Sequence, residues 1–229
     1  MRVAVVTVGD ELLAGEVTDT NSAWLASRLT DRGATVARMV TLPDDVDVIA
    51  DAIADLADRF DAVVVTGGVG PTHDDRTLSG VAAAFDREIT EHPDAVDWFD
   101  QHSDYQREDL TTGTTHLPAG ARMIGNDVGV APGAVVENVY VLPGVPAEME
   151  SMFERVADEF GGDRFHVETI EAAEPESALL DRIDAVRERF DVSVGSYPGD
   201  PVRIRLRSTD PEAVETAADW LRGRVESTD

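Results

Sequence analysis

Runs of consecutive apolar residues alternate with apolar stripes at helical spacing along residues 1–160. Residues 2–8 and 63–65 are almost uninterrupted apolar segments rich in valine, and a glycine follows closely after each. Such a run is typical of a strand buried on both faces in a parallel sheet. Residues 46–60 instead repeat apolar side chains at intervals of three and four, which predicts an amphipathic helix. The alternation predicts an α/β fold with a mostly parallel sheet, in which strand 63–65 is central.

The same patterns predict the other elements of this region. Strands are predicted at 34–40, 134–136 and 139–142, and helices at 20–32, 76–85, 93–107 and 146–160. Four threonines and a glycine predict a loop at 109–115. The methionines of the 146–160 helix fall on its apolar stripe, so we interpret them as packing side chains and not as metal ligands.

The pattern changes after Gly161-Gly162, which we interpret as a domain boundary between 1–162 and 163–229. The predicted order beyond it is strand 165–170, helix 176–190, strands 192–196 and 202–207, and helix 211–225, a small α+β unit with an antiparallel pair. Arg203, Arg205 and Arg207 alternate with apolar residues and so share one face. That face either binds an anion or acidic neighbour, or is an ordinary exposed face balanced by surface acids, which we favour.

The composition is strongly acidic. The chain carries 46 Asp and Glu against 19 basic residues, all arginine, for a net charge of −27. Such self-repulsion is tolerated best where salt screens it, so we expect a halophilic protein of a salt-rich cytoplasm. Duplex nucleic acid and anionic membranes are disfavoured as partners, because no basic patch is evident. No signal peptide or bilayer-length apolar run is found, and the absence of cysteine excludes thiolate chemistry.

The glycine-rich turn after strand 63–65 is the first candidate site. Gly67, Gly68 and Gly70 let the backbone approach a ligand, and the following helix directs its first N–H groups at the loop, which suits phosphate. Asp74 and Asp75 would repel a bare phosphate, so one of them is expected to act through a divalent cation or on a proton. The alternative is that Thr72 or Asp74 only caps the helix. Capping is the less favoured interpretation for Asp75, which lies further into the first turn of the helix.

Acids also follow the first two strands, at what should be the same sheet edge. Asp10 and Glu11 are candidates for metal or substrate contact and Asn21 for a ligand hydrogen bond, unless Asp19 or Thr20 caps a helix here and Asn21 is only a polar first-turn residue. Asp44 lies at this edge too, although capping of the next helix is the simpler interpretation. The five histidines show no paired spacing, so zinc is not supported.

Four motifs together resemble the CinA family and, more broadly, the molybdopterin-binding fold of molybdenum-cofactor biosynthesis proteins. They are Gly9-Asp-Glu-Leu-Leu-Ala-Gly with Asp19-Thr-Asn21, Thr66-Gly-Gly-Val-Gly-Pro-Thr-His-Asp-Asp75, Asn126 with Gly129-Val-Ala-Pro-Gly133, and Leu142-Pro-Gly-Val-Pro-Ala-Glu-Met149. They span residues 1–160, and the tail is similar to the small subdomain that follows this fold in CinA-like proteins. The nicotinamide-mononucleotide deamidase domain of many CinA proteins is not expected in this chain.

The resemblance implies a three-layer α/β/α domain, often oligomeric, that binds a phosphorylated pterin or nucleotide. Carried over by motif, the expected catalytic residues are Asp75 and Asp44. The expected metal ligands are Asp75, Asp10 and Glu11. The expected metal is Mg²⁺ or another divalent cation, and K⁺ is a further candidate ion. The expected substrate and phosphate contacts are Thr66, Gly67, Gly68, Gly70, Pro71, Thr72, Asn21, Asn126, Pro132, Gly133, Pro143 and Gly144.

Three functions follow from the resemblance. The first is metal-dependent hydrolysis of ADP-ribose-like dinucleotide pyrophosphates, which is associated with CinA-like domains. The second is adenylation of molybdopterin, which Asp74 weakens because the adenylating relatives have a basic residue before the final aspartate. The third is a binding module that has lost the chemistry. Both reactions act at a phosphoanhydride and need phosphate donors, a divalent ion and an aligned nucleophile.

Overall fold

The computed structural model describes residues 1–70, 75–102, 113–162 and 165–226. The chain divides into two compact units, Met1–Gly162 and Asp163–Asp229, and each is described by itself. In the described ranges, no helix is long and apolar enough to cross a bilayer.

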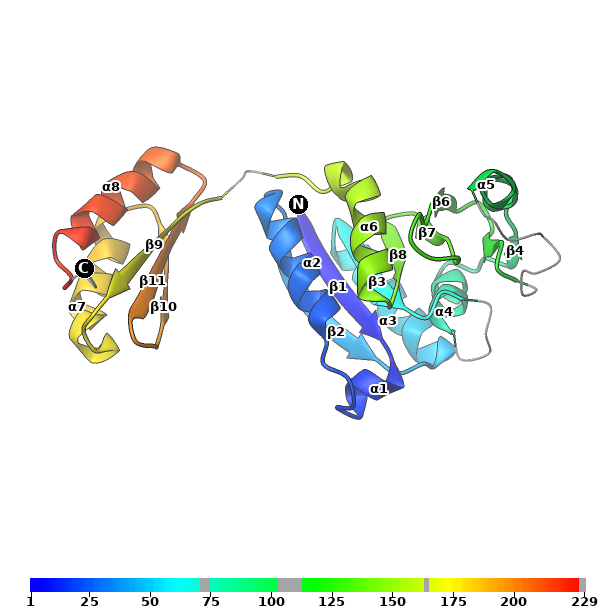
Figure 1. The fold of residues 1–229 in the computed structure, drawn as a ribbon, viewed down its shortest axis with the longest axis horizontal. Helices are drawn as coiled ribbons and strands as arrows, with labels where there is room; N and C mark the ends of the chain where they lie inside the picture. Colours follow the sequence, from blue (N-terminus) through cyan, green and yellow to red (C-terminus); the bar gives the residue numbers. More distant parts are fainter. Residues whose placement is uncertain (71–74, 103–112, 163–164, 227–229) are drawn as a thin grey trace. The chain divides into compact units, whose positions relative to one another are not determined.

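A six-stranded sheet forms the centre of the first unit (Figure 1). Its order is β2 (Thr35–Leu42), β1 (Arg2–Val8), β3 (Ala62–Gly67), β8 (Val139–Pro143), β7 (Gly133–Val136) and β6 (Arg122–Ile124). The first four strands run parallel, whereas β7 and β6 are antiparallel to their neighbours. Every residue of β3 is buried, which confirms the prediction of a central, parallel strand.

Helices cover both faces of this sheet, giving the three layers that were expected. On one face α3 (Val46–Arg59) and α4 (Thr77–Ala84) pack through Ile49, Ile53 and Val81 against Val63 and Val65. On the other face α2 (Thr20–Asp31) and α6 (Pro146–Val156) pack against Val5 and Val64, and this core contains Leu25, Leu29, Phe153 and the fully buried Met149 and Met152. The methionines are therefore packing residues.

Several short elements complete the unit. They are α1 (Asp10–Leu13), α5 (Pro93–His102), the 3₁₀ turn η2 (Ala157–Glu159), and the antiparallel pair β4 (Ile89–Glu91) and β5 (His116–Pro118). The three-residue strands β4, β5 and β6 were not predicted, because so few residues show no periodicity. The predicted continuation of α5 to 107 and most of the 109–115 loop lie outside the described residues.

The second unit contains β9 (His166–Ala172), α7 (Glu176–Arg189), β10 (Ser193–Tyr197), β11 (Val202–Ser208) and α8 (Pro211–Arg222), close to the predicted ranges. The strands form an antiparallel sheet in the order β10-β11-β9. Both helices lie on the same face of it, around Ile204 and Leu206 (Figure 1). The opposite face carries Arg203 and Arg205, which are exposed as predicted.

Candidate functional site

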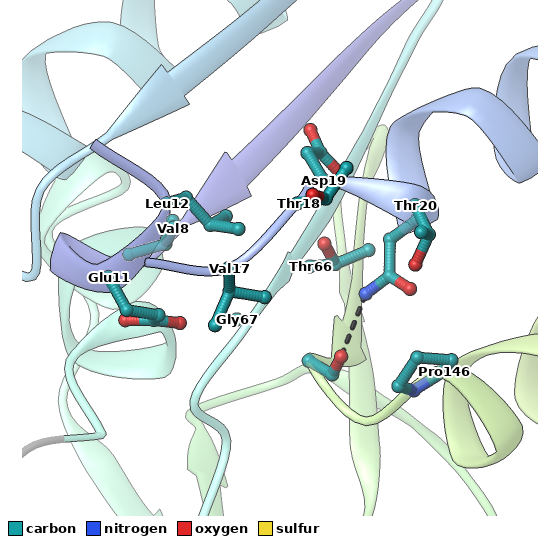
Figure 2. A pocket seen from close by; sticks show the side chains of 12 residues that line it. Val8, Glu11, Leu12, Val17, Thr18, Asp19, Thr20, Thr66, Gly67 and Pro146 are labelled. Carbon is teal, nitrogen blue, oxygen red and sulfur yellow. Dashed lines mark hydrogen bonds between the residues drawn. The ribbon is translucent and has the colours of Figure 1, made fainter. Parts of the chain in front are cut away.

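The carboxyl ends of four parallel strands meet at one edge of the large sheet. Thr7 in β1 is in register with Thr41 in β2 and Thr66 in β3, and Gly67 is in register with Pro143 in β8. The ends of β1 and β3 and the segments that follow β1 and β8 line a cavity of about 110 Å³ (Figure 2). Its walls are Val8, Glu11, Leu12, Val17, Thr18, Asp19, Thr20, Asn21, Thr66, Gly67, Gly144 and Pro146. The fold thus brings the predicted Glu11, Asn21, Thr66, Gly67 and Gly144 to one cavity.

The first wall is fixed by the start of α2. Asp19 is the N-cap: its Oδ1 accepts from the Ser22 N–H at 2.9 Å, and its Oδ2 accepts from Thr7 Oγ1 at 3.2 Å. This confirms the capping alternative for Asp19. Asn21, two residues on, is not merely a polar first-turn residue, because its Nδ2 donates to the Gly144 carbonyl at 2.8 Å, the dashed line in Figure 2. The bond ties the first turn of α2 to the turn after β8.

The amide oxygen of Asn21, Oδ1, accepts no hydrogen bond from the described residues. It is also shielded from solvent. A buried acceptor without a donor is costly, so some rearrangement or ligand that supplies a donor would be favoured at this wall.

The glycine-rich turn closes around Asp75. A Cβ placed on Gly68 would lie 2.1 Å from Asp75 Oδ1, and one placed on Gly70 would lie 2.7 Å from Asp75 Oδ2. Any larger residue at Gly68 or Gly70 would displace that carboxylate, so the glycines seat the acid as well as giving the backbone freedom. The predicted contacts Pro71 and Thr72, and the capping roles weighed for Thr72 and Asp74, lie outside the described residues.

Thr77, the first residue of α4, is a site residue that the sequence reasoning missed. It is fully buried, its N–H donates to the Gly68 carbonyl at 3.3 Å, and a Cβ on Gly67 would lie 2.4 Å from its Oγ1. Within the described residues this hydroxyl has no hydrogen-bond partner. The available signal was a hydroxyl side chain in the first turn of a helix entered from a glycine-rich loop, where such groups contact anions.

The capping role favoured for Asp44 is wrong. Asp45 is the N-cap of α3, and its Oδ1 accepts from the N–H groups of Asp47 at 3.0 Å and Val48 at 3.2 Å. Asp44 turns instead to the loop after β1: its Oδ2 accepts from the Asp10 N–H at 2.9 Å. Two consecutive residues thus have different roles: Asp45 caps α3, and Asp44 faces the loop after β1.

Three of the predicted acids act electrostatically on a fourth, Asp44, at this edge. Partial burial raises the pKa of Asp44, the Asp10 N–H opposes that change, and the charges of Asp10, Glu11 and Asp75 raise it further. All four carboxyl groups were predicted catalytic or metal-binding residues, so the fold does bring them into one neighbourhood. Carboxylate oxygens suit Mg²⁺. In the part of the chain that the structure describes, however, no three His, Asp or Glu side chains are grouped as a ready metal site, so metal binding stays a prediction.

Other predicted contacts lie away from the cavity. Asn126 is fully buried, and its amide is satisfied by Glu148, the Ala131 carbonyl and the N–H groups of residues 128 and 129. Pro132 and Gly133 are buried, and a Cβ on Gly133 would lie 2.4 Å from the Val141 carbonyl oxygen. In the structure Asn126 shapes a loop and Gly133 allows β7 to pack on β8, and direct ligand contact by these three residues stays a prediction. Pro143 is also buried, at the end of β8.

Comparison with known proteins assigns both units. Residues 4–161 match the family model described as "Probable molybdopterin binding domain", and residues 164–229 match "FAD synthase, middle domain". A protein of Archaeoglobus fulgidus is 38% identical over 95% of this chain and 95% of its own length. A CinA-like protein of Citrifermentans bemidjiense is 37% identical over 98% of this chain, which spans 58% of that relative. The solved structure of CinA from Thermoplasma acidophilum, titled as of unknown function, superposes with a TM-score of 0.63 at 33% identity and covers 70% of this chain and 99% of its own.

The chain belongs to the CinA-like molybdopterin-binding-domain family. Membership agrees with the parallel sheet, the cavity at its carboxyl edge and the glycine-rich turn. It makes the first unit a small-molecule binding module of the pterin or nucleotide type. The family assignment does not select a reaction, so the chemistry has to be argued from the residues at this edge.

Proposed function

We propose that the protein is a divalent-metal-dependent pyrophosphatase that hydrolyses ADP-ribose-like dinucleotides. The single observation that carries the proposal is that Asp44, which is hydrogen-bonded to Asp10, lies within electrostatic range of Glu11 and of Asp75, the acid seated by the glycine-rich turn. A turn of this kind suits phosphate, yet four carboxylates repel phosphate. A divalent cation held by some of these acids would reconcile the two, and when bound it would neutralise charge on the phosphate oxygens.

The turn supplies the phosphate contacts. Gly68 and Gly70 seat the Asp75 carboxylate in this turn, and α4 begins just beyond with Thr77, whose hydroxyl is unused within the described residues. Helix N-termini and unpaired donors both favour an anion. The neighbouring cavity, lined by apolar Val8, Val17 and Pro146 together with polar groups, would hold the base or the ribose.

Asp44 has the properties of a general base. Its carboxylate is held by the Asp10 N–H, and its pKa is raised by burial and by neighbouring acids. A carboxylate of higher pKa accepts a proton more readily. In this proposal Asp44 takes a proton from water while the water oxygen bonds to phosphorus. The anhydride P–O bond breaks, and the bridging oxygen leaves with one phosphate group. ADP-ribose would give AMP and ribose 5-phosphate.

The proposal is tested by incubating the purified protein with ADP-ribose and FAD, with and without Mg²⁺, in high KCl and following AMP. AMP should appear only with metal, and Asp75→Asn and Asp44→Asn should each abolish it. Asp45→Asn is the matched control, because asparagine also caps helices and Asp45 serves only the α3 cap. Undiminished turnover in Asp75→Asn would refute the assignment.

A non-catalytic pterin or nucleotide binder is the second candidate. It is favoured by the absence, within the described ranges, of three ligating side chains grouped as a ready metal site. Tight binding of nucleotide or pterin by calorimetry, without turnover under several metals at high salt, would select it. Adenylation of molybdopterin is the third, supported by the family's binding fold, and would require conversion of the pterin only when ATP is present.

A further inference from the structure

The open face of the small sheet concentrates positive charge in an otherwise acidic chain. Arg203 and Arg205 of β11 are exposed and Arg207 is half-buried, all on the face that α7 and α8 leave uncovered. Side chains two residues apart on a strand are separated by about 7 Å, so the three guanidinium groups form a row. The only acid in register with this row is Glu171, opposite Arg203.

Within the described residues, these three arginines make no ion pair. In the described part of this unit the ion pairs are made by Arg182, Arg187 and Arg222. Arg207 instead places its guanidinium carbon 3.7 Å from the centre of the Phe165 ring. The interpretation favoured from sequence, a face balanced by surface acids, is therefore not supported by the ion pairs that the structure shows.

An exposed tyrosine, Tyr197, lies on β10, the strand next to this row of arginines. Tyr197 is in register with Arg203, and Gly195 with Arg205. A Cβ on Gly195 would lie 3.2 Å from Cε2 and 3.4 Å from the hydroxyl oxygen of Tyr197, so the ring extends over a position with no side chain. Tyr197 nevertheless remains 47% exposed. Gly195 thus makes room for an aromatic surface alongside the row of cationic side chains.

We propose that this face, defined by Arg203, Arg205, Arg207 and Tyr197, binds single-stranded nucleic acid. A row of cations for the phosphates and an exposed aromatic side chain on which a base can stack are the two elements that bind a single strand without sequence readout. A row of three cations on an open sheet fits successive phosphates, whereas a free nucleotide is normally held in a concave pocket. The overall charge of −27 opposes general attraction of nucleic acid, so the binding is expected to depend on these residues.

The test is fluorescence anisotropy of the full chain with a short fluorescein-labelled oligouridylate over a series of KCl concentrations. The wild type should bind, and Tyr197→Ala should weaken binding about tenfold or more while Tyr197→Phe retains it. Arg203→Ala with Arg205→Ala should lower the magnitude of the log–log salt slope by about 1.4, since each phosphate contact on a single strand contributes about 0.7. Arg38→Ala is the control, since Arg38 is an exposed arginine on a strand of the other unit.

Melting curves of each variant should match the wild type, which shows that the face and not the fold is changed. Three results would overturn the proposal: no binding by the wild type, equal binding by the arginine and tyrosine variants, or loss of self-association in those variants in place of loss of oligonucleotide affinity. ADP-ribose hydrolysis should be the same in all of them, so this proposal and the pyrophosphatase proposal can fail separately.

Discussion

The backbone N–H groups of Asp10 and Asp44 each donate a hydrogen bond to the other residue's carboxylate, at the carboxyl edge of the large sheet. The Asp10 N–H donates to Asp44 Oδ2 at 2.9 Å, and the Asp44 N–H donates to Asp10 Oδ1 at 3.4 Å. The pair joins the loops after β1 and β2, and it holds two acids of like charge close together. Backbone N–H groups hold both carboxylates in place. The repulsion that remains between the two negative charges favours binding of a cation or a proton.

The raised pKa of Asp44 predicts a specific pH dependence of stability. Because the folded protein binds this proton more tightly than the unfolded chain, unfolding free energy falls as pH rises from about 3.8, the ordinary value, through the raised pKa. Asp44→Asn should therefore raise the melting temperature at neutral pH, and the gain should shrink as the pH falls through that window. Thermal melts of both proteins from pH 3 to pH 8, roughly the range that covers both forms, measure it. A gain that is constant with pH would show that Asp44 is not the group responsible.

Gly68→Ala should reduce hydrolysis strongly with little loss of fold. The added Cβ would meet Asp75 Oδ1 at 2.1 Å, so the carboxylate must move from its seat. Turnover of ADP-ribose with Mg²⁺ and far-ultraviolet circular dichroism give the two readouts. The control is Gly161→Ala, where the added Cβ meets nothing within 4 Å. Equal activity in the two variants would count against the role of Asp75.

Thr77→Val should separate a ligand role from a packing role. The buried hydroxyl has no partner among the described residues, so exchanging it for a methyl group of similar size should leave stability unchanged or raise it. Nucleotide affinity, measured by calorimetry with ADP-ribose and Mg²⁺, should fall several-fold if the hydroxyl contacts phosphate. Unchanged affinity would restrict Thr77 to the packing of Gly67.

Asn21→Ala should raise KM more than it lowers kcat. The substitution removes the 2.8 Å bond to the Gly144 carbonyl and so loosens two walls of the cavity, at a cost in stability of about 1 kcal/mol. Asn138→Ala is a matched control, since Asn138 Nδ2 donates to the Ala57 and Phe60 carbonyls at 3.0 Å each, outside the cavity wall. It should lower stability and leave KM unchanged. A shared change in KM would indicate a general effect on the fold.

The elements of this protein could be predicted because their signals are local. The valine runs of β1 and β3, the stripe of α3 and the glycine that ends α2 each lie within a short stretch of chain. Gly33 indeed has a φ of 87°, the left-handed conformation expected just after a helix. The family could likewise be predicted from the four motifs, because recognising them requires only the order and spacing of residues along the chain.

The individual roles at the edge could not be predicted in the same way. A rule that uses only neighbouring residues cannot tell which of Asp44 and Asp45 caps the helix. The two are distinguished by the Asp10 N–H, which approaches Asp44 from another loop. Asn126 matched a family motif, but its side chain is consumed by contacts within its own loop and with α6. Hydrogen bonding to distant residues decides whether a polar side chain is available to a ligand.

By itself the sequence determined the strands, the helices and the glycine-rich turn, since hydrophobic periodicity and backbone preferences act over a few residues. Tertiary structure decided that the charges of Asp10, Glu11 and Asp75 act on Asp44 and that Asp75 sits against Gly68 and Gly70. It also decided that Thr77 is buried without a partner in the described chain, and that Tyr197 spreads over Gly195. The physical reason is that pKa shifts, burial and close contacts arise from atoms far apart in sequence, which meet only once the sheets have formed.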